Sequence, residues 1–232
     1  MSLVSKALII RRLKVPSSME YAKYCADSCE RHGLDYEYID GIEFLEEKEA
    51  YKAVGVDSEY KTKYSKGHHN CHASHIKAWR RIIELDQCCI VLEHDAVVKG
   101  NVKNIEIPEM SVVTFGHRVM EERFYEPIGE IQDLVKINKS LGSHAYSITP
   151  ETAKFLIDDA EKNKVRENID IQLFYKPILD LYVVDPPQAV CWPRKTTREH
   201  QNEANEEIYV QGSMWNVSTS LTDNWKAGLK FE

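Results

Sequence analysis

The sequence predicts an α/β fold in which a mixed, mainly parallel sheet is flanked by helices. Short apolar runs rich in strand-forming residues alternate along the chain with longer segments whose apolar residues recur at helical spacing. Residues 7–10 form the first such run, a helical pattern follows over about 18–32, and an alternating pattern follows over 34–39. A strand, a helix and a second strand in this order are typical of a parallel βαβ unit.

The later elements follow from the same patterns. Residues 43–66 are polar and charged without a clear period, so we expect a loop with a short helix there. Thr149 and Pro150 have the residue types of a helix N-cap and first turn. We expect buried strands at 88–92, 111–115 and 145–148, helices at about 70–85 and 149–160, an irregular insertion at 117–138, and polar loops after about Pro186.

Length and composition limit the function classes. The 232 residues suit a single domain over 1–232, with a core at about 5–185 and C-terminal loops over 186–232. The net charge is −7, which argues against a dominantly basic nucleic-acid surface. No apolar run reaches the ~18 residues of a membrane helix. No Gly-rich nucleotide loop or Gly-x-Ser-x-Gly elbow occurs, which disfavours hydride transfer and serine hydrolysis.

The N-terminus and the cysteines favour a cytoplasmic protein. Residues 1–10 lack the apolar segment and the cleavage site of a secretory signal. Cys88 and Cys89 are adjacent within a predicted strand, where consecutive side chains point to opposite faces and make a poor disulfide. We therefore expect reduced thiols.

An acidic pair follows the predicted strand at 88–92. Glu93 and Asp95 are two residues apart, so on an extended backbone their carboxylates point the same way. Carboxylate oxygens suit a hard divalent cation, and ligands of open parallel sheets bind beyond the carboxyl ends of the strands. The pair suits a metal that bridges to a diphosphate; the alternative is a strand that ends in a solvated turn.

Residues 67–75 contain four histidines and one cysteine. Imidazole and thiolate are zinc ligands, but no Cys-x-x-Cys pair accompanies them. Because the segment lies where a helix begins, it can instead present N–H groups to an anion. Ordinary surface or core histidines are the third interpretation.

Several segments, taken in order, resemble glycosyltransferase family 25, the group that contains lipooligosaccharide and procollagen galactosyltransferases. The family's acidic triplet, usually Glu-Asp-Asp, corresponds to residues 93–95. Residues 142–151 closely resemble the family's Gly-x-x-Ala-Tyr-x-Ile-Ser-Pro-Glu segment. The other matching positions are Gly67, Cys71, Ser74, His75 and Trp79, the segments 38–41 and 112–116, and Ile169 with Asp170. The similarity spans about residues 5–185.

This resemblance implies a GT-A type nucleotide-sugar-binding fold and an inverting glycosyltransferase. The donor would be a nucleotide sugar, typically a UDP-hexose, and the cofactor a divalent cation, Mn²⁺ or alternatively Mg²⁺. Asp95 would bind the metal and Glu93 would assist at the metal or at the ribose. Asp170 is the candidate catalytic base, with a helix cap as the alternative. The expected donor-binding residues are Ile10, Arg11, Asp40, Gly67, Ser74, His75, Glu93, His94 and His144.

Some roles and functions stay open. Ser74 and His75 bind a substrate or brace the helix start, and Arg11 meets the nucleotide or is merely solvated. A bacterial surface oligosaccharide is the leading acceptor. The alternatives are a transferase that acts on a modified DNA base, a weak or inactive sugar-nucleotide-binding protein, and a zinc protein built on residues 67–75.

Overall fold

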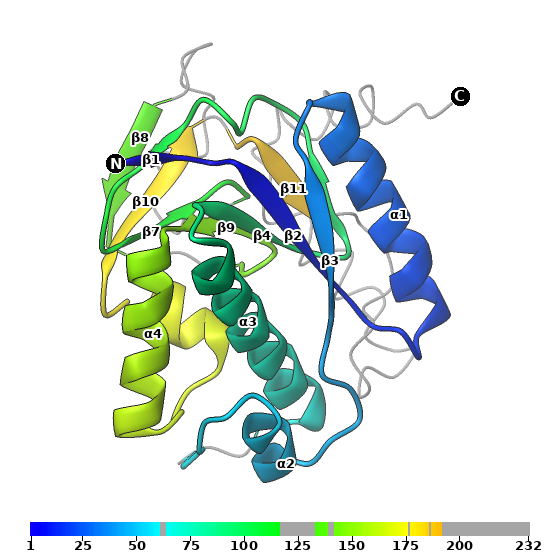
Figure 1. The fold of residues 1–232 in the computed structure, drawn as a ribbon, viewed down its shortest axis with the longest axis vertical. Coiled ribbons are helices and arrows are strands. Elements are labelled where there is room, and N and C mark those ends of the chain that lie inside the picture. The colour runs from blue at the N-terminus through cyan, green and yellow to red at the C-terminus, as the bar shows by residue number, and fades with distance from the viewer. Residues whose placement is uncertain (61–63, 117–132, 139–141, 176, 186, 192–232) are drawn as a thin grey trace.

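The computed structural model describes residues 1–60, 64–116, 133–138, 142–175, 177–185 and 187–191 (Figure 1). The main element is a seven-stranded sheet with the order β3-β2-β4-β9-β7-β10-β8. Its strands are β2 (Lys6–Arg11), β3 (Tyr36–Asp40), β4 (Cys89–Glu93), β7 (Ser111–Thr114), β8 (Asp133–Ile137), β9 (Ala145–Ile148) and β10 (Asp180–Asp185). Two small antiparallel pairs join β1 (Ser2–Leu3) to β6 (Glu106–Ile107) and β5 (Ala96–Val98) to β11 (Ala189–Cys191).

The sheet is mixed, as predicted. β2 pairs in parallel with both β3 and β4, which confirms the predicted βαβ opening. β9 pairs antiparallel with β4 and β7, so the sheet changes direction at its centre. β10 then pairs in parallel with β7 and antiparallel with β8. Parallel pairs therefore make up half of the described sheet rather than most of it.

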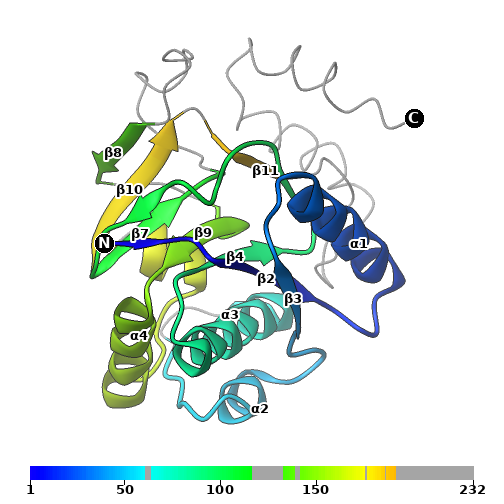
Figure 2. The same ribbon diagram turned by 45° about the horizontal axis from the view of Figure 1, so that its top comes forward.

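Helices cover both faces of the sheet. They are α1 (Pro16–Arg31), α2 (Glu47–Lys52), α3 (Lys66–Leu85), α4 (Pro150–Asn163) and a π-helical turn, η2 (Ile171–Tyr175). Ala7 and Ile9 of β2 pack in the core beneath α1, whereas Leu8 and Ile10 pack in the core beneath α3 and α4. This alternation follows from the two-residue period of a strand. Figure 2 shows α1 and the α3–α4 pair on opposite sides of the sheet.

Most of the predicted helix boundaries are confirmed. α1 ends before Gly33, whose φ of +64° is readily adopted by glycine. Thr149 caps α4 by accepting a hydrogen bond from the N–H of Thr152 at 3.3 Å. α3 ends at Leu85, and the next residue, Asp86, adopts the left-handed conformation. α3 begins at Lys66, about four residues before the predicted start, so the histidine-rich segment is helical from its first residue.

Two segments that were expected to lack regular secondary structure contain strands. Residues 133–137, within the expected insertion, form β8. Their side chains alternate between the two cores, with Val135 and Ile137 on the α3 side and Leu134 on the α1 side, which is the pattern of a strand. β11 also forms within the expected C-terminal loops. The rest of those two segments, residues 117–132 and 192–232, lies outside the described residues.

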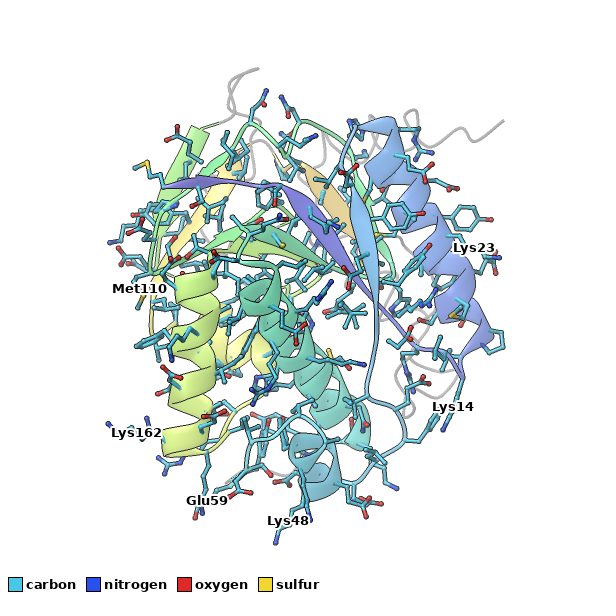
Figure 3. All side chains as sticks on the ribbon, viewed as in Figure 1. Lys14, Lys23, Lys48, Glu59, Met110 and Lys162 are labelled. Carbon is cyan, nitrogen blue, oxygen red and sulfur yellow. The ribbon has the colours of Figure 1, made fainter. Side chains whose placement is uncertain are left out.

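The thiol prediction agrees with the described structure. All six cysteines lie outside disulfides, and Cys88 and Cys89 lie in cores on opposite faces of the sheet. Lys14, Lys23, Lys48 and Lys162 lie at well-separated points around the rim of the molecule (Figure 3). Among the described helices, none has the length and apolarity that a bilayer crossing requires.

Candidate active site

Glu93 lies at the end of β4 and is the centre of the candidate site. Its backbone N–H donates to the carbonyl of His144 at 2.9 Å, which holds this strand end against the 142–144 segment. Its Oε1 accepts a hydrogen bond from Ser143 Oγ at 2.6 Å and lies 3.4 Å from Nε2 of His75. The side chain is 21% exposed, so the carboxylate is held by the protein but reachable from solvent.

Asp170 joins the same group of residues through Ser143. Its Oδ1 accepts hydrogen bonds from the backbone N–H groups of Gly142 at 3.3 Å and Ser143 at 3.2 Å. The N–H of Ile171 instead donates to Asn168 Oδ1 at 3.0 Å, so Asn168 caps this helical turn and Asp170 does not. Ser143 therefore connects the two carboxylates, with its hydroxyl on Glu93 and its backbone on Asp170.

His75 reaches Glu93 from α3 on the opposite side of the site. Its side chain is fully buried, and its Nδ1 lies 2.9 Å from Tyr146 Oη. The same hydroxyl accepts a hydrogen bond from Trp79 Nε1 at 2.8 Å. Burial raises the pKa of Tyr146, so this phenol stays neutral and orients the imidazole. Cys71 lies one turn before His75 on the same helix.

We call Cys71, His75, Glu93, Ser143 and Asp170 the Glu93 cluster. Sequence reasoning named His75, Glu93 and Asp170 as site residues, and the structure brings these three together. Ser143 was missed as a site residue, because a lone serine carries no catalytic signal. Cys71 was considered only as part of a possible zinc site over residues 67–75 and as a matching position, although its four-residue spacing from His75 places both on one helix face.

Asp95 faces different neighbours from Glu93. The chain turns after β4, and Asp95 Oδ2 accepts a hydrogen bond from Cys191 Sγ of β11 at 3.3 Å. On the α1 side, burial raises the pKa of Cys25, and Cys29 and the nearby Asp95 raise it further. The shared role of Glu93 and Asp95 at one metal ion is still a prediction.

The neighbouring triplet residue, His94, packs on α1. Its ring lies parallel to that of Tyr21, with the two centroids 6.1 Å apart. His94 is buried, which fits its place on the α1 side of the turn. Its expected contact with the nucleotide stays a prediction.

The predicted residues at the end of β2 contact the end of β3. Arg11 Nε donates to Asp40 Oδ1 at 2.8 Å, and the guanidinium lies 4.1 Å from the centroid of the Tyr38 ring. Burial raises the pKa of Tyr38 to about 12. Ile10 lies directly opposite both Ile39 and Glu93 in the sheet, which places it at the same sheet edge as the Glu93 cluster.

Ser74 has the partners of a bracing residue. Its Oγ accepts a hydrogen bond from the N–H of Ile42 at 2.8 Å and donates to the carbonyl of Asn70 at 2.6 Å. A Cβ atom on Gly41 would lie 3.0 Å from this hydroxyl, so glycine permits the close approach. Gly67 is buried in the first turn of α3. The structure thus supports the bracing interpretation of Ser74.

His144 lies over two glycines. A Cβ atom on Gly116 would lie 2.2 Å from Nε2 of His144, and one on Gly142 would lie 3.1 Å from its Nδ1. The imidazole therefore occupies the space that these glycines leave open. This packing fixes the 142–144 segment, which carries Ser143.

The histidines of residues 67–75 face separate neighbours. His68 Nδ1 lies 2.7 Å from Ser65 Oγ, and His69 Nε2 lies 3.9 Å from Glu47 Oε2. His72 is buried beside Tyr51, and only His75 meets Glu93. The four imidazoles do not share one centre. Among the described residues, one trio of possible metal ligands has its donor atoms within 4.8 Å of one another, namely Cys71, His75 and Glu93.

Comparison with solved structures gives distant similarities. A glycosyltransferase involved in the glycosylation of the major capsid of PBCV-1 is similar over 68% of each chain, with 14% identity and a TM-score of 0.30. The apo-form glycosyltransferase GlyE of Streptococcus pneumoniae TIGR4 is similar over 98% of this chain, with 12% identity and a TM-score of 0.43. The present chain covers 65% of the GlyE chain.

Comparison with protein sequences is more specific. No curated protein matches the chain. The family model described as Glycosyltransferase family 25 (LPS biosynthesis protein) matches residues 17–125, which contain nearly all of α1, all of α3 and the 93–95 triplet. The match confirms the glycosyltransferase predicted from the sequence, and residues 17–125 are similar to glycosyltransferase family 25.

Proposed function

We propose that this protein transfers a sugar, with inversion, from a nucleotide-sugar donor to a hydroxyl of a glycan. The family match supports the reaction class. One structural observation carries the proposal further: Ser143 connects Glu93, at the predicted donor site, with Asp170, the predicted base. Two carboxylates from distant parts of the chain thus converge on one short segment.

Asp170 would act as the general base. Its Oδ1 is held by two backbone N–H groups, whereas its Oδ2 accepts no hydrogen bond from the described residues. An anchored carboxylate with one open oxygen suits removal of a proton from an acceptor hydroxyl. Fixing Oδ1 limits rotation of the side chain, so the open oxygen keeps one direction.

The carboxylates of Asp95 and Glu93 would hold a divalent cation, Mn²⁺ or Mg²⁺. Both side chains are half-buried and supply the hard oxygen donors that these ions prefer. A bound cation would neutralise the charge that develops on the leaving diphosphate. The Ser143 hydroxyl would keep Glu93 in place at the edge of this site.

The donor, acceptor and compartment complete the proposal. A UDP-hexose is the donor that the sequence resemblance implies. A bacterial surface oligosaccharide is the acceptor class that agrees with the description of the matching family as an LPS biosynthesis protein. Six cysteines that form no disulfide suit the reducing cytoplasm.

A nucleotide-release assay tests this function. The purified protein is incubated with a panel of nucleotide sugars with and without Mn²⁺, and release of the free nucleotide is measured. We expect Mn²⁺-dependent release from one donor and its loss in Asp95→Asn. Asp158→Asn is the matched control, because Asp158 is an exposed residue of α4 paired with Lys154, and it should keep full activity. Full turnover in Asp95→Asn contradicts the metal role, and donor binding without release indicates an inactive binding protein.

A further inference from the structure

We propose that Cys71, His75 and Glu93 form a binding site for a thiophilic divalent metal such as Zn²⁺, which shares Glu93 with the predicted hard-cation site but does not use Asp95. We call these three residues the Cys71 trio. The inference concerns metal binding alone and stands whether or not the protein transfers sugars.

The backbone arranges the trio as a metal site requires. Cys71 and His75 are four residues apart on α3, so their side chains lie one above the other on the same helix face. Glu93 approaches this face from the end of β4. All three donor atoms lie within 4.8 Å of one another.

The distance between His75 and Glu93 suits a shared metal ion. Tetrahedral zinc with bonds of about 2.0–2.2 Å to nitrogen and oxygen separates those two ligand atoms by ~3.4 Å. The observed separation of His75 Nε2 from Glu93 Oε1 is 3.4 Å. The third donor, Cys71 Sγ, lies within 4.8 Å of both atoms, and its approach to the shared ion would complete a three-ligand site.

His75 supplies the observation that points to a ligand. Its side chain is fully buried, and its Nε2 faces Glu93 Oε1 at 3.4 Å but forms no hydrogen bond with any of the described residues. A buried polar atom that forms no hydrogen bond destabilises the folded protein. Metal coordination at Nε2 would satisfy this atom, because the opposite nitrogen, Nδ1, is already engaged with Tyr146 Oη at 2.9 Å. An outer partner of this kind fixes the ring and the tautomer of a histidine ligand.

The Glu93 carboxylate is also held in position by a hydrogen bond from a neighbouring side chain. Ser143 Oγ donates to its Oε1 at 2.6 Å, which is the hydrogen bond expected behind a ligating carboxylate. Cys71 and Glu93 are both partly exposed, so an ion can reach them from solvent. A thiolate and a carboxylate together also balance the charge of a divalent cation.

The donor atoms determine which metal the site would prefer. Sulfur, imidazole nitrogen and one carboxylate oxygen suit Zn²⁺ or Co²⁺, whereas Mn²⁺ and Mg²⁺ prefer oxygen donors. Three protein ligands also leave a fourth position open for water or another oxygen ligand. The sulfur and nitrogen donors of Cys71 and His75 therefore differ in chemistry from the Asp95 carboxylate, and Glu93 is the ligand that the two predicted sites share.

A titration with Co²⁺ tests the proposal directly. Co²⁺ is added to protein freed of metal, and the thiolate-to-metal charge-transfer absorption and the ligand-field bands are recorded. We expect both signals, with displacement by Zn²⁺ but not by an equal concentration of Mg²⁺. Cys71→Ser should remove the charge-transfer band and weaken binding by about 100-fold or more, since even outer-shell changes cost about 10- to 100-fold.

Cys191→Ser is the matched control, because Cys191 is the thiol beside Asp95. Cys191→Ser and Asp95→Asn should both retain the thiolate-to-metal charge-transfer band. His75→Gln should weaken Co²⁺ binding while Asp95→Asn does not, which separates this site from the proposed catalytic cation. The proposal is overturned if the parent protein gives no thiolate band, or if the band persists in Cys71→Ser, whether or not it is lost in Cys191→Ser.

Discussion

His72 and His75 lie one turn apart on α3, yet their surroundings differ in chemistry. His75 faces the Glu93 carboxylate at the edge of the sheet, and its Nδ1 is engaged with Tyr146. His72 is fully buried, and its Nδ1 lies 3.3 Å and 3.4 Å from the hydroxyls of Tyr51 and Tyr60. The two tyrosine hydroxyls also contact each other closely.

His75 belongs to a candidate reactive region, whereas His72 belongs to a structural one. Burial lowers the pKa of His72 to about 3, with the neighbouring His75 adding to the effect, so His72 is neutral at physiological pH. Burial also raises the pKa values of Tyr51 and Tyr60, so this group consists of neutral residues. The Glu93 cluster instead contains two carboxylates that are reachable by ligands. A histidine-rich sequence thus supplies both a polar core and a candidate site, and only the partner residues distinguish them.

The largest effect is expected from Asp170→Asn in the Glu93 cluster. The amide oxygen can still accept the N–H groups of Gly142 and Ser143, but the side chain can no longer remove a proton. Sugar transfer should fall by roughly 10²- to 10⁴-fold, the usual contribution of a general base. Single-turnover rates and calorimetric donor binding measure the two steps separately.

The expected result is slow transfer with unchanged donor affinity and unchanged thermal stability. Asp158→Asn again serves as the control for removal of a carboxylate. Transfer at the parental rate in Asp170→Asn would show that another group is the base.

The second prediction concerns pH and the buried His72. Because its pKa falls from about 6.5 in the unfolded chain to about 3 in the folded protein, only the unfolded state gains a proton between these values. Its contribution to stability is therefore fully present above about pH 6.5 and is lost as the pH falls toward 3, by at most ~1.4 kcal/mol per pH unit. In His72→Gln, the free energy of unfolding should depend less on pH in this range. Urea unfolding at several pH values would measure this.

His32→Gln is the matched control, since His32 is an exposed histidine just after α1. His32→Gln should leave most of the pH dependence of the free energy of unfolding unchanged. An unchanged slope in His72→Gln would mean that carboxylates alone produce the acid sensitivity, and the structural assignment of His72 would then be wrong.

The sequence predicted the parts of the fold that local patterns determine. The βαβ opening, the Thr149 cap and the strands around residues 88–92 and 145–148 all have periodicity or capping residues that are visible in a short window. β8 was missed, because its five residues lie within a segment of mixed polarity and gain their pattern only from pairing with β10. The antiparallel direction of β9 likewise depends on contacts distant in the sequence.

The candidate site was predictable in its residue types but not in its grouping. Glu93, His75 and Asp170 were found from spacing and resemblance, whereas their connection through Ser143 requires the folded chain. The prediction that the carboxylates of Glu93 and Asp95 point the same way assumed an extended backbone. The turn after β4 gives them different neighbours instead, and no local sequence pattern reveals which partner each carboxylate meets.

The smallest expected effect comes from Ser74, which lies on α3 between the two regions compared above. Ser74→Ala removes the acceptor of the Ile42 N–H and leaves that partly buried donor unsatisfied, so the free energy of unfolding should fall by about 1–2 kcal/mol. Donor KM should not change, because the hydroxyl is already committed to Ile42 and Asn70. Ser5→Ala, which removes a more exposed hydroxyl that donates to Cys88, should cost less. A large rise in donor KM without loss of stability would instead assign Ser74 to the substrate, and it would extend the reactive region one residue along the helix from His75.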